Sequence, residues 1–507
     1  MARRSEDGLL NLAEKGDVQG LERFLRKHKG LSVNCISKDG RWSPLVKAVW
    51  AGELPAVQWL IEHAHADVDF APPKYGITAL HQAAMNNHTD IARWLLEFGN
   101  ASPNTVSVNR GSTPLITAAS KGYLEIVKML VEKNPTNIQF TNKYGEYTAA
   151  RDAAREGHVD VLRHLLVSGL ISGDNAWPIK GKDTTPLSNA IRSKEYDNRI
   201  VFCLINEGNA NVNTPCTDDK TNDTPLHIAC AMGSLRIVRE LVKHGAHLEA
   251  TNAFGETPLF CACRAKKHEN IVRYLIHEAG ANVNAQRSDG STPLLFAIQS
   301  FYRNDLVEWY GHEVEVLCQT RYLFSHHFSF LRYSKIRHSL LQPNDIDLEI
   351  IDSRGATALM CACEKRNENA IVGLIKAGAR VDVVHESLGT ALHVACSKIY
   401  ASILPVQCLI ENGKADANAI RPRDGFTSLM VACQRRSLNL ITCEYLIQNA
   451  RVNLLTRDKE GRSARDLAEG CVELVALFIR QEQFYQKHWD LVQSCVHNGW
   501  LNPRQTS

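Results

Sequence analysis

Thiols and imidazoles are the side chains whose spacing in this sequence could bind a metal or activate a nucleophile. Cysteines stand two residues apart twice, and a histidine precedes a cysteine by three residues twice, in the pairs Cys261/Cys263, Cys361/Cys363, His227/Cys230 and His393/Cys396. A Cys-x-Cys pair on one helix turns its thiols to different faces, and no second pair lies at zinc-ligand spacing. We therefore expect no bound metal and no cofactor.

Several of these cysteines occupy one slot of a recurring phrase. The same slot holds Ala84, Ala119 or Ala154 in other copies and a thiol in five, namely Cys230, Cys263, Cys363, Cys396 and Cys433. A position that alternates between Ala and Cys favours a small apolar core side chain. The sequence also lacks the nucleotide-binding, zinc-protease and nucleophile-elbow motifs, and its carboxylates are scattered. We therefore expect no enzyme.

The elements that position these residues are copies of the phrase "TPLHIACAMG", which begins at Thr224. Successive copies begin 33 to 39 residues apart, with one interval of 65, at Ser43, Thr78, Thr113, Thr148, Thr185, Thr224, Thr257, Thr292, Thr357, Thr390, Thr427 and Ser463. A period near 33 residues with Thr-Pro-Leu-His-x-Ala is typical of ankyrin repeats. The chain therefore resembles the ankyrin-repeat family over nearly its whole length.

Each copy encodes two helices. Thr224 can cap the first helix, Pro225 suits its first turn and Gly233 can end it. The following "LRIVRELVKHG" has the apolar spacing of a second helix. In the family, the His slot resembles a hydrogen-bonding brace between adjacent repeats. One such unit cannot bury its apolar face alone, whereas a stack buries a continuous core.

The resemblance implies an all-α solenoid of about thirteen stacked ankyrin-type helix pairs with short β-hairpin fingers. We divide the chain into an N-terminal capping repeat, ankyrin repeats, an aromatic-rich insertion, further repeats ending in a compressed cap, and a C-terminal tail. Their ranges are 1–37, 38–300, 301–330, 331–481 and 482–507.

Composition narrows the class of partner and the compartment. The 507 residues are 44% hydrophobic and 22% charged with a net charge of +3, which gives no reason to expect nucleic-acid binding. No apolar run is long enough for membrane insertion. The 15 cysteines and a start unlike a signal peptide favour a reducing compartment. We expect a cytoplasmic protein, with the nucleus as the alternative.

The resemblance implies a non-enzymatic scaffold that is monomeric apart from its partner and binds one or more proteins through its finger tips and concave face. Each finger contains a recurring glycine, and the residue directly before that glycine varies while its neighbours stay fixed. A longer finger before Thr185 adds a tryptophan. These partner-binding candidates are Tyr75, Arg110, Tyr144, Trp177, Phe254, Asp289, Arg354 and Asp424. The alternative for each fingertip residue is a solvated turn side chain, and for Trp177 packing across its own loop.

Two departures from the repeat carry further candidates. The 65-residue interval contains about 28 extra residues, whose aromatic side chains include Trp309, Tyr310, Tyr322 and Phe324. We consider four interpretations of this insertion: a surface excursion, an extra helix packed on the stack, a partner-docking element, or a gene-model error.

In the tail, Leu491 and Cys495 resemble the start of the elongin-binding box of cullin-ring ubiquitin-ligase substrate receptors. Gly499 stands where that family has an aliphatic residue. A substrate-recruiting ligase subunit is therefore our alternative function, and an amphipathic end-cap helix is the default interpretation of the tail.

Overall fold

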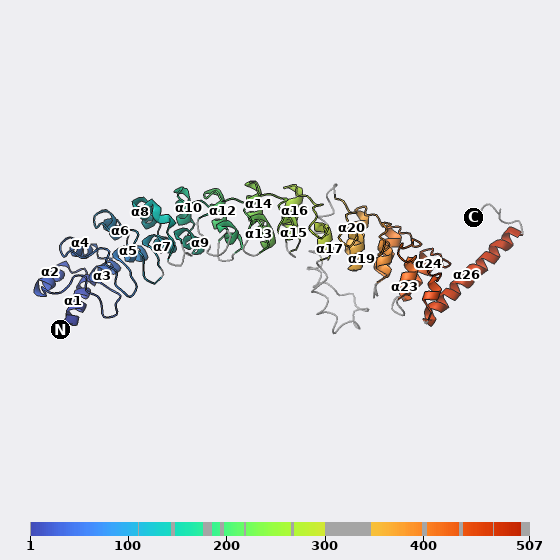
Figure 1. Ribbon diagram of the computed structural model, residues 1–507, viewed down its shortest axis with the longest axis horizontal. Helices are drawn as coiled ribbons and strands as arrows, with labels where there is room; N and C mark the ends of the chain where they lie inside the picture. The colour runs from blue at the N-terminus through green and yellow to red at the C-terminus, as the bar shows by residue number, and fades with distance from the viewer. Residues whose placement is uncertain are drawn as a thin grey trace, which may run out of the picture. The chain divides into compact units, whose positions relative to one another are not determined.

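The computed structural model describes residues 2–109, 111–142, 148–175, 185–192, 197–216, 220–264, 268–299, 346–397, 403–434, 440–469 and 471–497. The chain divides into two units, Met1–Ala253 and Phe254–Ser507. In each unit helices follow one another in pairs, so that first helices contact first helices and second helices contact second helices (Figure 1).

The N-terminal unit contains seven described pairs. Its first helices are α1 (Ala2–Glu14), α3 (Pro44–Ala51), α5 (Ala79–Asn86), α7 (Pro114–Lys121), α9 (Ala149–Arg155), α11 (Pro186–Arg192) and α13 (Pro225–Met232). Its second helices are α2 (Val18–Lys27), α4 (Leu54–Glu62), α6 (Thr89–Glu97), α8 (Leu124–Lys133), α10 (Val159–Val167), α12 (Asn198–Asn206) and α14 (Leu235–Lys243). A short 3-10 helix, Pro135–Gln139, follows α8.

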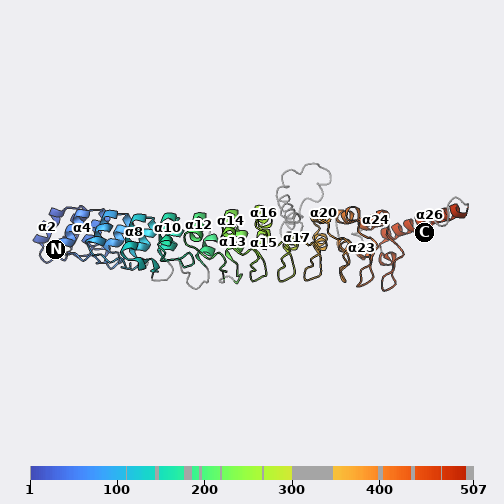
Figure 2. The ribbon, with the colours of Figure 1, turned by 90° about the horizontal axis from the view of Figure 1, so that it is seen from above.

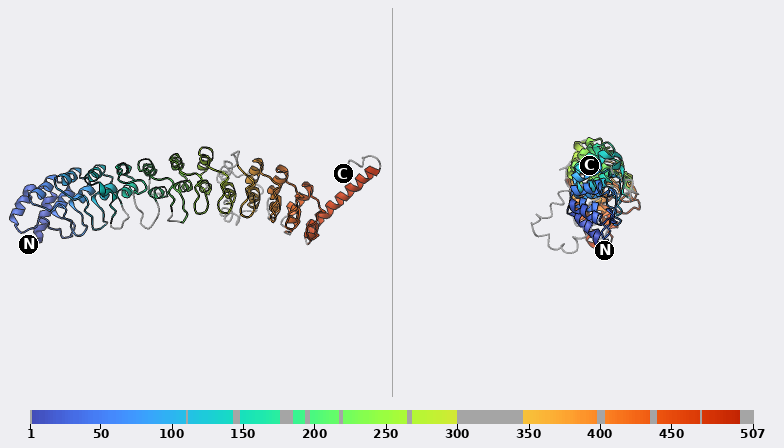
Figure 3. Two further views of the ribbon diagram at one scale, coloured as in Figure 1. Left: turned by 45° about the horizontal axis from the view of Figure 1, so that its top comes forward. Right: turned by 90° about the vertical axis from the view of Figure 1, so that its left-hand side faces the viewer.

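The C-terminal unit continues the same order. Its described first helices are α15 (Pro258–Arg264), α17 (Pro293–Gln299), α19 (Ala358–Glu364), α21 (Ala391–Cys396), α23 (Ser428–Cys433) and α25 (Ala464–Leu467). Its described second helices are α16 (Glu269–His277), α20 (Glu368–Lys376), α22 (Leu404–Gln407) with a π-turn at Cys408–Asn412, α24 (Leu440–Asn449) and α26 (Val472–His497). Within this unit α26 continues past the last repeat (Figure 3).

Local signals start and stop the first helices as the sequence predicts. The Thr113 hydroxyl accepts a hydrogen bond from the Ile116 N–H at 3.3 Å, and Pro114 occupies the first turn of α7. Gly122 then ends α7 in the left-handed region, with φ of 78°. The cap, the proline and the glycine together fix the length of the helix.

The predicted β-hairpin fingers are not confirmed. The finger turns project along one side of the helices in each unit (Figure 2), but the described residues contain no β-strand, only three isolated bridges such as Cys216–Asp223. Neighbouring fingertips are joined by single backbone hydrogen bonds, including Val108 N to Tyr75 O at 2.9 Å. Turns this tight leave too little extended backbone for a ladder. The count of about thirteen repeats stays a prediction.

The recurring thiols lie in the core, which confirms that part of the sequence analysis. Cys230, Cys263, Cys363, Cys396 and Cys433 are all fully buried. Burial raises the pKa of the Cys396 thiol well above its usual range. These side chains therefore act as small apolar packing groups rather than nucleophiles.

Histidines link consecutive repeats. The His393 ring lies with Nδ1 2.9 Å from Thr390 Oγ1 in its own repeat and Nε2 2.9 Å from the Phe426 carbonyl oxygen in the next finger. His81 makes the same pair of contacts, to Thr78 and to the Ser112 carbonyl oxygen. Burial lowers the pKa of His81 to about 4, although its bond to Ser112 opposes that change. A neutral imidazole therefore braces adjacent repeats.

The predicted insertion at 301–330 lies outside the described residues. The sequence places this insertion between the two helices of one repeat, and that repeat nevertheless contacts the next repeat directly. The Ser353 N–H donates to the Asp289 carbonyl oxygen at 2.8 Å, and Gln299 Nε2 donates to Asp352 Oδ2 at 3.2 Å. The extra residues therefore do not interrupt the stacking of α17 on α19.

Candidate protein-binding surface

We use the name finger face for the surface formed by the finger turns and the adjacent sides of the first helices. In the N-terminal unit this face contains a groove of about 320 Å³ between the fingers and helices α5, α7 and α9. Tyr75, Ile77, Met85 and Ile116 supply its apolar lining, and Lys121 supplies charge. The groove can therefore accept an apolar side chain together with polar groups around it.

Tyr75, one of the predicted contact residues, is held by the finger that carries it. Its carbonyl oxygen accepts from Val108 N in the next finger at 2.9 Å. The Arg41 guanidinium and Lys74 Nζ lie 5.5 and 5.8 Å from the centre of its ring. Cations at this distance are attracted to the face of an aromatic ring. The ring of Tyr75 therefore lies between the next finger and two basic side chains.

An aromatic cluster that the sequence analysis missed lies in the preceding repeat. The rings of Trp42 and Trp50 meet edge to face at 5.7 Å, and Lys47 Nζ lies 4.7 and 4.4 Å from their centres. Lys47 also pairs with Glu14 at 3.3 Å, which ties α3 to the capping helix. Trp50 is 42% exposed. The sequence feature that could have revealed this cluster is Trp50 itself, a large aromatic residue at a solvent-facing position of a first helix.

The first described finger of the C-terminal unit carries Phe254, which is 53% exposed. Its carbonyl oxygen accepts from Ser288 Oγ at 2.7 Å, so the next finger fixes the turn. Exposed aromatic side chains on fixed turns are well suited to anchor a partner.

Asp289 lies in an ion pair within its own finger. Arg287 donates to it through Nε at 2.8 Å and through Nη2, and this bonding lowers the pKa of Asp289 well below its usual range. Arg287 also reaches the buried Glu256 at 3.2 Å and lies 5.0 Å from the centre of the Phe296 ring. The aspartate therefore orients an arginine over an aromatic ring.

Arg354 and Asp424 are also held by charged neighbours. Arg354 donates to Asp352 and Glu364, both at 2.9 Å, which raises its pKa against the opposing effect of burial. Asp424 accepts from Arg421 Nη2 at 2.6 Å. Burial opposes ionisation of Asp424, but the hydrogen bonds from Arg421 and the Phe426 N–H outweigh it and lower its pKa. Both predicted residues therefore stiffen their fingers as well as facing solvent.

The remaining candidates lie beyond what the structure describes. Outside the described residues are Arg110, Tyr144, Trp177, Trp309, Tyr310, Tyr322 and Phe324. Leu491 and Cys495 lie on α26, but their side chains are outside the described part. Their predicted roles remain predictions.

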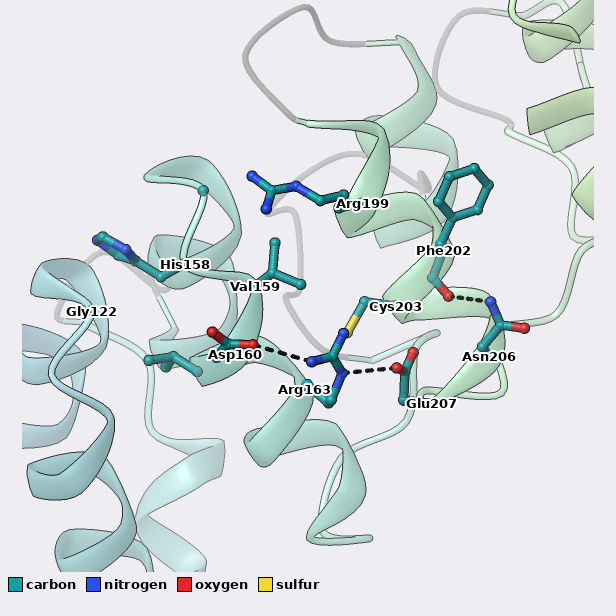
Figure 4. A pocket seen from close by; sticks show the side chains of 12 residues that line it. Gly122, His158, Val159, Asp160, Arg163, Arg199, Phe202, Cys203, Asn206 and Glu207 are labelled. Atoms are coloured by element: carbon teal, nitrogen blue, oxygen red, sulfur yellow. Dashed lines mark hydrogen bonds and ion pairs between the residues drawn. The ribbon is translucent and has the colours of Figure 1, made fainter. Parts of the chain in front are cut away.

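A second hollow, of about 440 Å³, lies between α10 and α12 on the side of the second helices (Figure 4). Arg163 bridges Asp160 at 3.1 Å and Glu207 at 2.9 Å, so its guanidinium is already occupied. The hollow also contains Cys203, but burial raises the pKa of this thiol to about 12. His158 Nε2 lies 3.1 Å from the Ser120 carbonyl oxygen. The Cys203 thiol is therefore protonated near neutral pH and is not poised as a nucleophile.

Within the described part of the chain, no three or more His, Cys, Asp or Glu side chains lie together where they could hold a metal ion. Among the helices that the structure describes, none combines the length and apolarity needed to cross a membrane.

Comparison with known proteins gives the family. Residues 9–107, 99–174, 153–252 and 247–316 match the family model described as "Ankyrin repeats (3 copies)". The chain belongs to the ankyrin-repeat family. Each unit is accordingly an ankyrin-repeat solenoid, whose described residues form helices and almost no strand. Ankyrin repeats are generally protein–protein interaction modules, and the fold is typically a non-enzymatic scaffold.

Two individual similarities accompany the family match. The tyrosine-protein kinase HTK16 of Hydra vulgaris is 30% identical over 114 residues, which is 22% of this chain and 14% of the kinase. The solved ankyrin repeat domain of Bcl-3, described as a unique member of the IkappaB protein family, is 24% identical with a TM-score of 0.40. That match covers 51% of this chain and 99% of the Bcl-3 domain.

Proposed function

We propose that this chain is a non-enzymatic interaction protein that binds a protein partner along its finger face. The observation that carries the proposal is the groove of about 320 Å³, because it combines an apolar lining with charged and polar groups at one place on that face. The proposed contacts are the eight fingertip positions, namely Tyr75, Arg110, Tyr144, Trp177, Phe254, Asp289, Arg354 and Asp424.

Rigid presentation is the proposed mechanism. Backbone hydrogen bonds join neighbouring fingers, as between Lys459 N and Asp424 O at 3.0 Å, and ion pairs such as Arg421–Asp424 fix side chains within a finger. A surface that is ordered before binding loses little conformational entropy when the partner docks. We further propose a cytoplasmic chain that is monomeric apart from its partner.

The test is quantitative capture of the endogenous partner by full-length protein carrying Tyr75→Ala or, separately, Phe254→Ala. Each change removes an aromatic anchor and is expected to reduce capture about tenfold, with the urea midpoint unchanged. The matched control is Phe98→Ala, because Phe98 caps α6 on the second-helix side and is 73% exposed. Equal capture by all three variants would remove the finger face from the proposal.

A further inference from the structure

Two buried cysteines contact each other inside one repeat of the C-terminal unit. Cys433 is the last residue of the first helix α23, and Cys443 lies on the second helix α24 of the same repeat. Their Sγ atoms are 3.9 Å apart, and both side chains are fully buried. The repeat therefore holds two thiols in direct contact in its core.

This pair distinguishes its repeat from the others. The fourth residue of the second helices α2 to α16 and of α20 is a buried aliphatic side chain, namely Leu21, Val57, Ala92, Val127, Leu162, Val201, Val238, Val272 and Ile371. Cys443 occupies the same position of α24. Its partner Cys433 occupies the first-helix slot that alternates between Ala and Cys. Among these repeats, only the one built from α23 and α24 carries a thiol at both positions.

We infer that Cys433 and Cys443 form a redox-sensitive modification site, at which a peroxide converts the two thiols into a disulfide that links α23 to α24. One thiolate of the pair attacks hydrogen peroxide, so that an S–O bond forms, the O–O bond breaks and the departing hydroxide takes up the proton of that thiol to become water. The other thiol attacks the resulting sulfenic sulfur, so that the S–S bond forms, the S–O bond breaks and a second water leaves with the remaining proton. The two sulfurs together lose two electrons to the peroxide.

The geometry of the pair suits this reaction. A disulfide bond is about 2.0 Å long, so the two sulfurs must approach each other by about 2 Å. Rotation of a cysteine about χ1 moves its sulfur over that scale without displacing the backbone. Because the two thiols already touch, a sulfenic acid formed at either cysteine has the partner thiol beside it. The pair therefore favours the reversible disulfide over irreversible oxidation.

The reduced pair still packs as the core thiols of other repeats do. The contact with Cys443 and burial raise the pKa of the Cys433 thiol well above its usual range. Since the thiolate is the reactive form, the reaction is slow and proceeds through local opening of the repeat. The site therefore responds to sustained oxidation and is not a catalytic nucleophile.

The disulfide would constrain the repeat that contains it. It joins residues that are 10 positions apart in the sequence, one on each helix. Such a cross-link stabilises mainly by restricting the unfolded chain. We therefore expect α23 and α24 to open less often in the oxidised protein than in the reduced protein.

Peptide mapping of the full-length native protein after treatment with hydrogen peroxide tests the inference. Trypsin cleaves after Arg435 and Arg436, which lie between the two cysteines, so a disulfide keeps two tryptic peptides joined. Remaining thiols are blocked with iodoacetamide in urea before digestion. Mass spectrometry is expected to show the Cys433 and Cys443 peptides joined after peroxide and separate after dithiothreitol. Oxidation of the half-buried Cys408 serves as the control that peroxide has acted.

Variants that copy other repeats keep the core packed. Cys443→Val introduces the residue that α14 and α16 carry at this position, and Cys433→Ala introduces the residue of other copies; each should abolish the joined peptides. Cys396→Ala removes a neighbouring thiol in the same way and should leave them in place. Amide hydrogen exchange in α23 and α24 should become about tenfold slower when wild type is oxidised, and should not change in Cys443→Val.

Several outcomes would overturn the inference. Peroxide that oxidises Cys408 without joining the two peptides would do so, as would a disulfide from Cys433 to Cys396 or Cys471, whose charges also influence Cys433. Sulfinic acid at either cysteine in place of the disulfide would have the same meaning. Unchanged or faster exchange of α23 and α24 in the oxidised protein would contradict the link between the helices. Partner capture by the finger face is independent of each of these results.

Discussion

Acidification should weaken the joint between the repeats that His81 connects. The ring is 1% exposed, its Nδ1 faces the Thr78 N–H and hydroxyl, and its Nε2 lies 2.9 Å from the Ser112 carbonyl oxygen. Nδ1 therefore accepts and Nε2–H donates, so a proton added at Nδ1 would face the Thr78 N–H. Burial is the main reason that the pKa of His81 is lowered to about 4.

The sign of the effect follows from proton binding. An unfolded histidine has a pKa of about 6.5, so between about pH 6.5 and pH 4 the unfolded chain binds more protons at this position than the folded chain. The free energy of unfolding therefore falls as the pH falls through this window. Each pH unit costs about 1.4 kcal/mol, which gives a loss of about 2 kcal/mol between pH 7 and pH 5.

Urea unfolding of wild type and His81→Gln at both pH values measures this loss. The variant is expected to be less stable by about 1 kcal/mol at pH 7, because it loses part of the hydrogen bonding. Between pH 7 and pH 5 it should lose about 2 kcal/mol less than wild type. His247→Gln, which removes an exposed imidazole in the same unit, is the control. Parallel pH dependence of wild type and His81→Gln would refute the reasoning.

Three further predictions concern the fold. In urea unfolding, Gly122→Ala should lower the free energy of unfolding by about 1 kcal/mol more than Gly157→Ala does. Both glycines have a positive φ, but only at Gly122 would the added Cβ lie 2.5 Å from the His158 imidazole. Equal losses would contradict this prediction. Arg287→Ala should destabilise the protein by about 2 kcal/mol, because the buried Glu256 carboxylate loses one of its partners. Arg273→Ala, which breaks the exposed helical pair with Glu269, should cost under about 0.5 kcal/mol. Similar losses for the two variants would argue against a stabilising role of the Arg287–Glu256 pair. Iodoacetamide should label the half-buried Cys408 in native protein and leave the buried Cys363 unlabelled until urea is added. Mass spectrometry measures the labelling at each cysteine. Labelling of Cys363 in native protein would contradict its assignment to the core.

Features set by residues close in sequence were predictable. Thr113, Pro114 and Gly122 fix one helix within a span of ten residues, and each acts through a local backbone preference. The core role of Cys396 followed from the Ala/Cys alternation at its slot. The His brace could be predicted because it joins two copies of one motif, as at His393.

Features that depend on particular side chains of different repeats were not predictable. The groove combines Tyr75, Met85 and Ile116 from two repeats, and no motif specifies which side chains meet there. The pairing of Arg287 with Glu256 joins two fingers 31 residues apart. The expected hairpins are not confirmed among the described residues, because the family resemblance implies a finger, whereas local turn geometry decides whether its backbone forms a ladder.

Site-directed photo-crosslinking tests the central claim most directly. A photoreactive phenylalanine analogue at position 75 or, separately, position 98 samples the finger face and the second-helix side of the same unit in full-length protein. The account predicts a discrete crosslinked protein partner from position 75 and none from position 98. Crosslinking of the partner from position 98 and not from position 75 would contradict it.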